Sequence, residues 1–324
     1  MLPYGLAKQE THKKDREARK DVNPAAAGHS RRMALLRHFG FFGNDTRGAV
    51  IKRAVSADEL AAAYRLVHDV FVERGRIGPH PTGMRVGLFE ALPETATFIA
   101  VDAGEVVGVQ SITMNNGDLG LPSDQAFQDE IDVLRIGESA IASGCGHIVW
   151  EATNQAIAPA YRKSAVATEL MRCVFAHAMA IGCDELITAV SPGHARFYEL
   201  LGFEKTSPVR SNSAEVDDPV VVMRVNVAGL IARAVDANDD SDEATIFVKC
   251  RCVASNPYRE KVRQWEAEAQ AVFADPQGLR RLFVEASGLL SQCSEEEREA
   301  ICRSWGADVF ASVYQQKTAE VSLV

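Results

Sequence analysis

A carboxylate interrupts one of the most apolar stretches of the chain. Glu151 lies within HIVWEATNQAIA, residues 147–158, where most neighbours are apolar or small. A carboxylate on a half-buried strand is costly unless it has a partner or a chemical use. Glu151 is therefore the best candidate for a general base that removes a proton from a substrate. The alternative is that Glu151 lies on the solvent face and pairs with a lysine or an arginine.

A short basic turn follows this stretch and precedes a helical pattern. Arg162 and Lys163 stand directly before Ser164, and small residues continue to Ala167. The N-terminus of a helix presents unpaired N–H groups and a partial positive charge, which together suit a phosphate group. The turn is therefore a candidate phosphate site, unless its two cations simply solvate the start of the helix.

A tyrosine and a histidine lie in a third tract, HARFYELLGFE, which spans residues 194–204. The hydroxyl of Tyr198 can protonate a leaving group, or its ring can pack with Phe197 and Phe203 in the core. His194 can bind a substrate or act as a base, and a histidine that caps the helix fits the sequence equally well.

Hydrophobic periodicity predicts the elements that must position these residues. Strand patterns lie at 50–55, 97–102, 106–115, 147–157, 185–190 and 220–225. Helix patterns lie at 56–75, 124–135, 164–181 and 193–201. Ser56 and Glu59 are spaced as a capping box for the first of these helices. This order predicts an α/β fold with a mixed central sheet flanked by helices, rather than a strictly alternating doubly wound sheet.

The chain divides into four expected regions. Residues 1–47 contain ten lysines and arginines against five acidic residues, and we expect them to lack regular structure or to form a docking arm for an acidic partner. The α/β domain occupies 48–235. An acidic linker with a short strand occupies 236–257, and a helical C-terminal extension occupies 258–324. Its helix patterns lie at 258–274, 277–290 and 295–315.

Composition argues against several classes of function. The 324 residues carry a net charge of −9 with a sequence pI near 5.5, which disfavours a nucleic-acid binder. The seven cysteines are scattered and include no CxxC pair, so we expect neither a metal site nor a disulfide framework. The sequence shows no secretory leader and no apolar run of 18 residues. We therefore expect a soluble, cytoplasmic protein without a transmembrane segment.

The stretch from Glu151 to Phe203 resembles the core of the GNAT-superfamily acyltransferases, because a strand, a turn of small residues, a helix, a second strand and the FYELLGFE tract follow one another. Three further features are YRLVHDVFVERG at 64–75, the core strand itself, and LGLPS at 119–123 before an acidic helix. With them, roughly residues 50–226 resemble the long-chain N-acyl amino acid synthases and the exosortase-associated acyltransferases. Both groups are relatives of the acyl-homoserine lactone synthases.

This resemblance implies a GNAT-like fold and a reaction. The enzyme would be an N-acyltransferase that moves a long-chain acyl group from the phosphopantetheine thioester of an acyl carrier protein to the amine of an amino acid or a similar acceptor. Glu151 would be the base and Tyr198 the acid. The donor arm would contact Ala156, Ile157, Ala158, Arg162, Lys163, Ser164, Ala165, Val166 and Ala167. For the acceptor we expect contacts from Arg65, Arg74, Asn154 and His194.

The turn departs from the superfamily pattern at one position. The pattern is Arg or Gln, two residues, Gly, one residue, and then Gly or Ala; Arg162 and Ala167 match it, but the first glycine position holds Ala165. A methyl group there crowds the backbone against a pyrophosphate. The departure favours a carrier protein over coenzyme A as the donor, and no permanently bound cofactor or metal is expected. The alternatives are an acetyl-coenzyme-A-dependent N-acetyltransferase and a non-catalytic domain that binds an acyl ligand.

Overall fold

The computed structural model describes residues 34, 35, 37, 43–115, 117, 119–136, 147–211, 218–235 and 249–321. The expectations for residues 1–33, for the acidic linker before residue 249 and for Cys145 fall outside the described residues. In the parts of the chain that the structure describes, no helix is both long enough and apolar enough to span a membrane.

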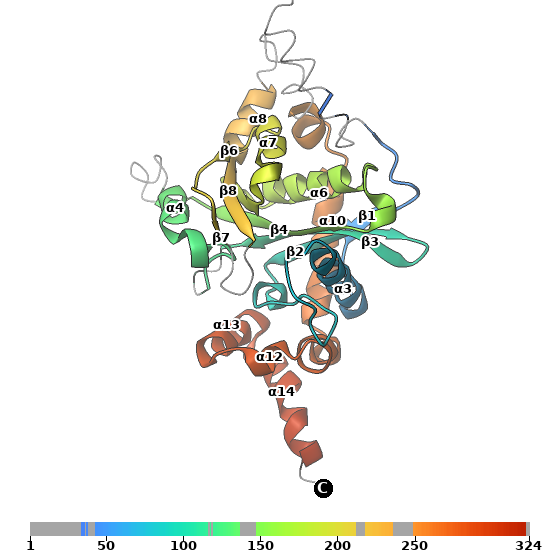
Figure 1. Ribbon diagram of the computed structural model, residues 1–324. Coiled ribbons are helices and arrows are strands. Elements are labelled where there is room, and N and C mark those ends of the chain that lie inside the picture. The colour runs from blue at the N-terminus through green and yellow to red at the C-terminus, as the bar shows by residue number, and fades with distance from the viewer. Residues whose placement is uncertain are drawn as a thin grey trace, which may run out of the picture.

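A mixed sheet of eight described strands forms the centre of the molecule (Figure 1). Its order is β1-β2-β3-β4-β5-β8-β6, and β7 pairs with β8. Among the described strands, β4 runs parallel to β5 and the other pairs are antiparallel. The bounds are β1 Val50–Arg53, β2 Thr95–Asp102, β3 Glu105–Met114, β4 Val149–Ile157, β5 Glu185–Val190, β6 Glu204–Lys205, β7 Arg210–Ser211 and β8 Pro219–Asn226. The predicted mixed α/β sheet is confirmed.

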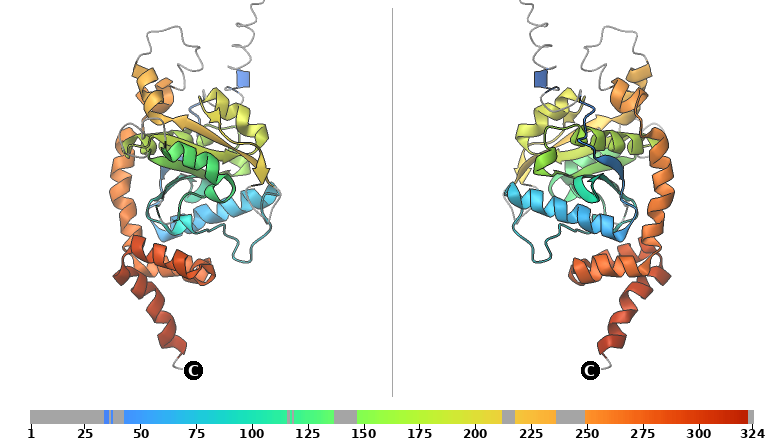
Figure 2. Two further views of the ribbon diagram at one scale, coloured as in Figure 1. Left: turned by 90° about the vertical axis from the view of Figure 1, so that its left-hand side faces the viewer. Right: turned by 90° about the vertical axis from the view of Figure 1, so that its right-hand side faces the viewer.

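Helices cover both faces of this sheet (Figures 1 and 2). Helices α6, α7 and α8 lie on one face, and α3 lies on the opposite face. Neighbouring residues of β2 therefore enter different cores: Phe98 packs with the α6 residue Leu170, and Ile99 packs with the α3 residue Val67. The helices of this part are α3 Ala57–Glu73, η1 Phe89–Ala91, α4 Asp124–Ile136, η2 Pro159–Tyr161, α6 Val166–Ala180, α7 Pro192–Leu200 and α8 Val227–Val235.

Local signals fix the ends of several elements. Ser56 Oγ accepts a hydrogen bond from Glu59 N at 3.2 Å and caps α3 as predicted. The carboxylate of Glu59 accepts a hydrogen bond from the amide of Val55 at 2.9 Å. The second bond of the expected capping box therefore forms with the residue before Ser56. The predicted hairpin of β2 and β3 turns at Ala103 and Gly104, whose φ values of 49° and 87° suit a type I′ turn.

A close approach of helix to sheet positions the N-terminus of α6. Val166 is the first residue of α6, and a Cβ atom added to Gly108 of β3 would lie 2.6 Å from its Cγ1 atom. The missing side chain at Gly108 therefore allows the helix to start directly against the sheet. This contact holds the basic turn of residues 162–165 beside the end of β4.

The C-terminal helices are more broken than the sequence predicts. The expected helix over 277–290 is interrupted at Gly288, which has a φ of 69°, and the expected helix over 295–315 is interrupted at Gly306, which has a φ of 86°. Glycine reaches these left-handed values without a steric penalty and ends a helix there. In the segment before 258, where a short strand is expected, the described residues 249–254 are helical. The elements are η3 Lys249–Ala254, α10 Arg259–Phe273, α11 Pro276–Leu279, η4 Arg280–Ala286, α12 Leu289–Gln292, α13 Glu295–Trp305 and α14 Ala307–Val321, with η3 and η4 of the π type.

Helix α10 joins this extension to the edge of the sheet. It runs past the β1 edge from the α6 face to the α3 face (Figures 1 and 2). The guanidinium of Arg53, which is 3% exposed, forms an ion pair with Glu266 of α10. His177 of α6 lies 3.8 Å from the same carboxylate. Burial, with a smaller effect of Arg53, lowers the pKa of His177 to about 3, so the imidazole is neutral at neutral pH.

We predict that Glu266→Gln destabilises the whole fold, because it leaves the buried Arg53 cation without a counter-charge. Breaking a buried pair costs about 3–5 kcal/mol, and since Glu266 is partly exposed we expect a loss of roughly 2 kcal/mol in the free energy of unfolding. Urea titration at pH 7 measures this loss. Glu268→Gln, an exposed position on the same helix, is the matched control and should change little. Equal effects of the two substitutions would contradict the role of the pair.

Candidate active site

The site lies where β4 separates from β5. The parallel ladder joins Val149 to Glu185, Trp150 to Leu186 and Glu151 to Ile187, and ends there. One residue further along, the hydroxyl of Thr188 donates to the carbonyl of Ala152 at 2.9 Å, so a side chain takes the place of a ladder hydrogen bond. A cavity of about 1000 Å³ occupies the opening and reaches residues on both faces of the sheet.

A bulge in β4 enlarges this opening. Asn154 has a φ of 55°, a left-handed conformation that is rare within a strand. Its side chain holds the bulge in place, because Asn154 Nδ2 donates to Glu90 Oε1 at 2.6 Å and Arg85 Nη1 donates to Asn154 Oδ1 at 2.6 Å. The loop that follows α3 is thereby joined to the central strand.

Glu151 is the last residue of the parallel ladder and borders the cavity. Its side chain is 2% exposed, and both carboxylate oxygens accept hydrogen bonds from Ser123, at 2.9 Å from the amide and 2.5 Å from the hydroxyl. Burial raises the pKa of Glu151 to about 7, although the bonds from Ser123 act in the opposite direction. A carboxylate with this pKa can accept a proton from an amine at neutral pH.

Tyr198 of α7 lies on the other side of the opening, next to Thr188. Its ring is buried and makes edge-to-face contacts with Phe197 and Phe203, so the predicted core packing is present together with a place on the cavity wall. Burial raises the pKa of Tyr198 to about 12, with Thr188 lowering it slightly. The phenol therefore stays protonated at neutral pH and can donate a hydrogen bond into the cavity.

The basic turn before α6 is partly neutralised. The fork of Arg162 forms a bidentate ion pair with Glu73 at the end of α3, including a bond from Nη1 to Oε1 at 2.9 Å. Its Nε donates to the carbonyl of Ile157 at 3.3 Å. Lys163 is exposed and has a φ of 65°. Arg162 therefore braces the end of β4 against α3, and Lys163 keeps an exposed positive charge at the mouth.

Two amides of the first turn of α6 have no acceptor among the described residues. They belong to Ala167 and Thr168, both of which line the cavity. The amide of Ala165 is already used, because it donates to the carbonyl of Asp45 at 2.9 Å. The helix N-terminus thus offers part of a phosphate site, and the segment before β1 takes one of its donors.

The end of β4 offers a further backbone donor. The amide of Ala158 donates to the carbonyl of Val107 at 2.9 Å. It is therefore not available to the donor arm, which the sequence led us to expect at Ala158. Because successive amides of a strand point to opposite edges, the amide of Ile157 faces the opening.

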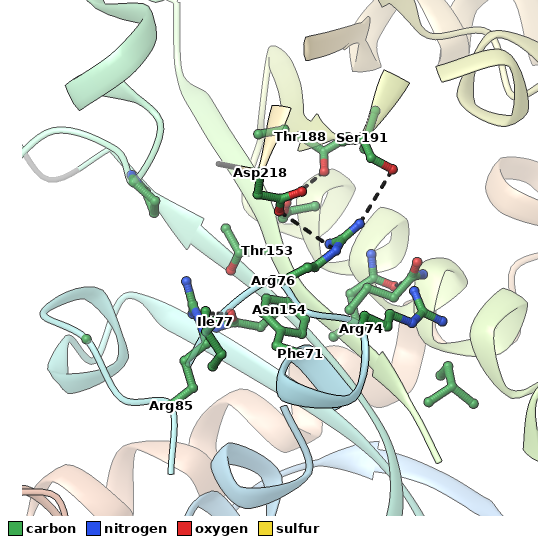
Figure 3. Close-up of a pocket in the computed structure, with 18 of the residues that line it drawn as sticks. Phe71, Arg74, Arg76, Ile77, Arg85, Thr153, Asn154, Thr188, Ser191 and Asp218 are labelled. Atoms are coloured by element: carbon green, nitrogen blue, oxygen red, sulfur yellow. Dashed lines mark hydrogen bonds and ion pairs between the residues drawn. The ribbon is translucent and has the colours of Figure 1, made fainter. Parts of the chain in front are cut away.

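Three guanidinium groups gather around the opposite part of the cavity, as Figure 3 shows. Arg76 and Arg85 lie against the ring of Phe71, with Cζ atoms 5.5 and 5.3 Å from its centroid. Arg76 also contacts Ser191 at 3.5 Å and Asp218 at 3.8 Å. The guanidinium of Arg85 has one hydrogen bond to a described residue, the one from Nη1 to the Asn154 bulge, and the same Nη1 lies 4.0 Å from Glu90 Oε1. Its Nη2 and Nε can therefore meet a ligand.

His194 and Arg74 also line this part of the cavity. Ser191 Oγ and His194 Nδ1 lie 2.7 Å apart, so His194 contacts the side chain of the residue that precedes α7. Burial, followed by Arg76 and Arg74, lowers the pKa of His194. Burial and then Arg162 and Arg76 lower the pKa of Arg74. These shifts indicate that a bound anion would relieve repulsion among the cations.

The structure brings most of the predicted residues to one cavity. Those that line it are Arg74, Glu151, Asn154, Ile157, Arg162, Lys163, Ser164, Ala167, His194 and Tyr198. Ala156, Ala158, Ala165 and Val166 are not among the lining residues. Arg65 does not join them, because it points to solvent from the exposed face of α3. The sequence analysis missed Arg85, Thr188 and Ser123, whose roles depend on contacts between distant segments.

We predict that Glu151 lowers the stability of the protein as the pH rises. Its pKa is about 7 in the folded protein and about 4.5 when unfolded, so its contribution is fully present below pH 4.5 and is lost as the pH rises through 7. The loss should reach about 3 kcal/mol at pH 8.5 as an upper value. Urea unfolding at pH 5 and pH 8.5 checks this, with Glu151→Gln as the comparison. A difference between the two proteins that does not vary with pH would contradict the raised pKa.

The chain is similar to several solved structures. The structure of FeeM, an N-acyl amino acid synthase from uncultured soil microbes, is 21% identical, covers 56% of this chain and 90% of FeeM, and has a TM-score of 0.46. The acyl-homoserine lactone synthase LasI is 17% identical over 55% of this chain and 89% of its own, with a TM-score of 0.40. The coenzyme-A-dependent acyl-homoserine lactone synthase BjaI is 18% identical over 63% of this chain and 100% of its own, also at 0.40.

No curated protein matches the chain. The family described as N-acyl amino acid synthase FeeM matches residues 62–226, which is just over half of the sequence and contains β2 to β8 together with the cavity walls that they form. The chain therefore belongs to the N-acyl amino acid synthase FeeM family and is an N-acyltransferase.

Proposed function

We propose that the protein transfers a long-chain acyl group from the phosphopantetheine thioester of an acyl carrier protein to the amine of an amino acid. The observation that carries the proposal is the single cavity at the β4–β5 opening. It joins a helix N-terminus suited to a phosphate, a buried carboxylate with a pKa of about 7, and a guanidinium whose fork is largely unused. These are the three groups that this reaction needs.

The donor end favours a carrier protein. The amides of Ala167 and Thr168 can bind one phosphate, but the Ala165 amide is occupied by Asp45, whose exposed carboxylate also repels negative charge. A pyrophosphate would therefore meet fewer donors and one anion. Lys163 at the mouth suits the acidic surface that carrier proteins usually present.

The chemistry follows from the placement of Glu151 and Tyr198. Glu151 takes a proton from the acceptor ammonium or from the attacking amine, and the amine nitrogen forms a bond to the thioester carbon. The tetrahedral intermediate then collapses, the C–S bond breaks, and an amide and a pantetheine thiolate remain. The thiolate finally takes up one of the two protons that the acceptor ammonium loses. A phenol with a pKa of about 12 is a weaker acid than an alkyl thiol, at about 8.5, so Tyr198 stabilises the leaving thiolate by a hydrogen bond and does not fully protonate it.

The acceptor end is assigned to the face of the sheet that carries α3. The donor arm enters beside α6, so the amine must approach the thioester from the opposite side of the opening. There Arg85 is fixed by Asn154 and lies over Phe71, which leaves Nη2 and Nε available to bind a carboxylate. A cavity of about 1000 Å³ lies at the upper end of the ~300–1,000 Å³ range of ligand pockets, which suits a long acyl chain together with an amino acid.

The direct test of this function supplies the purified protein with long-chain acyl groups on a carrier protein and, separately, on coenzyme A, together with a mixture of amino acids. We expect N-acyl amino acids by intact-mass spectrometry, formed faster from the carrier protein thioester. Glu151→Gln should lower the rate by about 10²–10⁴, the usual contribution of a general base. Faster use of acetyl-coenzyme A, with short products only, would favour the N-acetyltransferase alternative.

We also predict that Arg85→Ala raises KM for the amino acid by at least about tenfold, because a charge-assisted pair contributes roughly 1.5–3 kcal/mol. The donor KM should stay unchanged. Initial rates measured against each substrate in turn separate the two parameters. Lys52→Ala, which removes a cation that pairs with Glu59 outside the cavity, is the control. An effect of Arg85→Ala on donor KM alone would contradict this placement.

A further inference from the structure

The helical extension, which lies outside the family match, supplies part of the cavity wall. Ser287, Leu289 and Gln292 line the cavity together with the loop residues Phe89 and Glu90. Ser287 lies in the turn between η4 and α12, and Leu289 and Gln292 belong to α12, on the same side of the sheet as α3 (Figure 1). That is the side to which the acceptor is assigned above.

This turn is firmly attached to the catalytic part of the molecule. Leu282 and Phe283 before it and Leu290 after it are buried in the same core as the α3 residues Leu60 and Tyr64. A rigid support of this kind lets a side chain discriminate between ligands by contact.

A hydrogen bond from α13 fixes the facing loop as well. The indole N–H of Trp305 donates to the carbonyl of Ala91 at 2.7 Å and is buried. This bond attaches the extension to the loop that carries Arg85 and Glu90. These two residues in turn hold the Asn154 bulge. The extension therefore forms part of the cavity wall and also supports the loop residues that line the cavity.

The two side chains that matter most differ in character. Leu289 is 8% exposed and adds an apolar surface to those of Phe71 and Phe89. Gln292 is exposed, and its side-chain amide has no hydrogen-bond partner among the described residues, so it has a donor and an acceptor to offer. Neither side chain is charged, which suits an acceptor whose own side chain is uncharged.

We infer that the extension completes the acceptor pocket, and that Leu289 and Gln292 select among amino acid acceptors with uncharged side chains. The inference rests on the proposed function. The donor thioester, held on the α6 side, does not meet this wall, so acceptor choice and donor use should respond separately.

The test uses the full-length protein, one long-chain carrier-protein thioester and a panel of amino acids with small, large and charged side chains. Leu289→Ala should shift the ratio of kcat/KM between large and small acceptors by about tenfold, the effect of a few methylene groups in a pocket. Gln292→Ala should change the ranking among polar and apolar acceptors, with the donor KM unchanged. Because Gln292 is exposed, this second variant should fold even if the first does not.

Matched controls come from the same extension. Leu282→Ala removes a buried leucine of the same core that does not border the cavity, and Gln270→Ala removes an exposed amide on α10. Both should keep the acceptor ranking of the wild type, and the first should lower the melting temperature.

Three results would count against the inference in different ways. If the acceptor ranking is unchanged in Gln292→Ala and in a folded Leu289→Ala variant, the inference about the extension is overturned and the proposed function stands. A change in the preferred acyl length without a change in acceptor ranking overturns it by assigning this wall to the acyl chain. The absence of any N-acyl amino acid from the wild-type protein overturns the proposed function and this inference with it.

Discussion

The site depends on the separation of two parallel strands that are paired for three residues. A parallel ladder normally continues as long as both strands do. Here the left-handed turn at Asn154 bends β4, and the Thr188 hydroxyl satisfies the Ala152 carbonyl that lost its ladder partner. The separation exposes a backbone edge to a ligand and places Glu151 at the branch point. It also connects the two faces of the sheet, so a donor held on one face can meet an acceptor held on the other.

Charge is distributed so that this opening is cationic in an acidic protein. The chain carries a net charge of −9, yet Arg74, Arg76 and Arg85 lie together in the cavity. Burial, not a neighbouring carboxylate, is the main reason for the raised pKa of Glu151, and Ser123 limits the rise by binding both oxygens. The result is a carboxylate that changes protonation state near neutral pH, beside cations that can hold an anionic substrate.

Much of the fold could be predicted because its signals are local. The cap at Ser56 and the turn at Ala103 and Gly104 depend on neighbours in the sequence, and the structure has them in those places. The helical breaks at Gly288 and Gly306 could have been found by the same reasoning, since each glycine lies inside a predicted helix. The π-helix at 249–254 carries no comparable local signal, because alternating cysteines fit a strand as well.

The site was only partly predictable because its contacts join distant segments. Glu151 was found through its apolar neighbours, but its partner Ser123 ends the LGLPS tract and has no local mark of that role. Arg85 resembles any loop arginine until Asn154 fixes it, at a separation of 69 residues. The methyl group of Ala165 signalled a changed phosphate turn, whereas the backbone contact from Asp45 required the tertiary structure.

If the Glu151 carboxylate at the branch point takes the proton from the amine, its titration must appear in the pH dependence of kcat/KM for the acceptor. We expect two rising inflections in the wild type, one near pH 7 from Glu151 and one at higher pH from the α-amino group of the acceptor. In Glu151→Gln the lower inflection should disappear and the higher one remain. Identical profiles for the two proteins would contradict the assignment of Glu151 as the base.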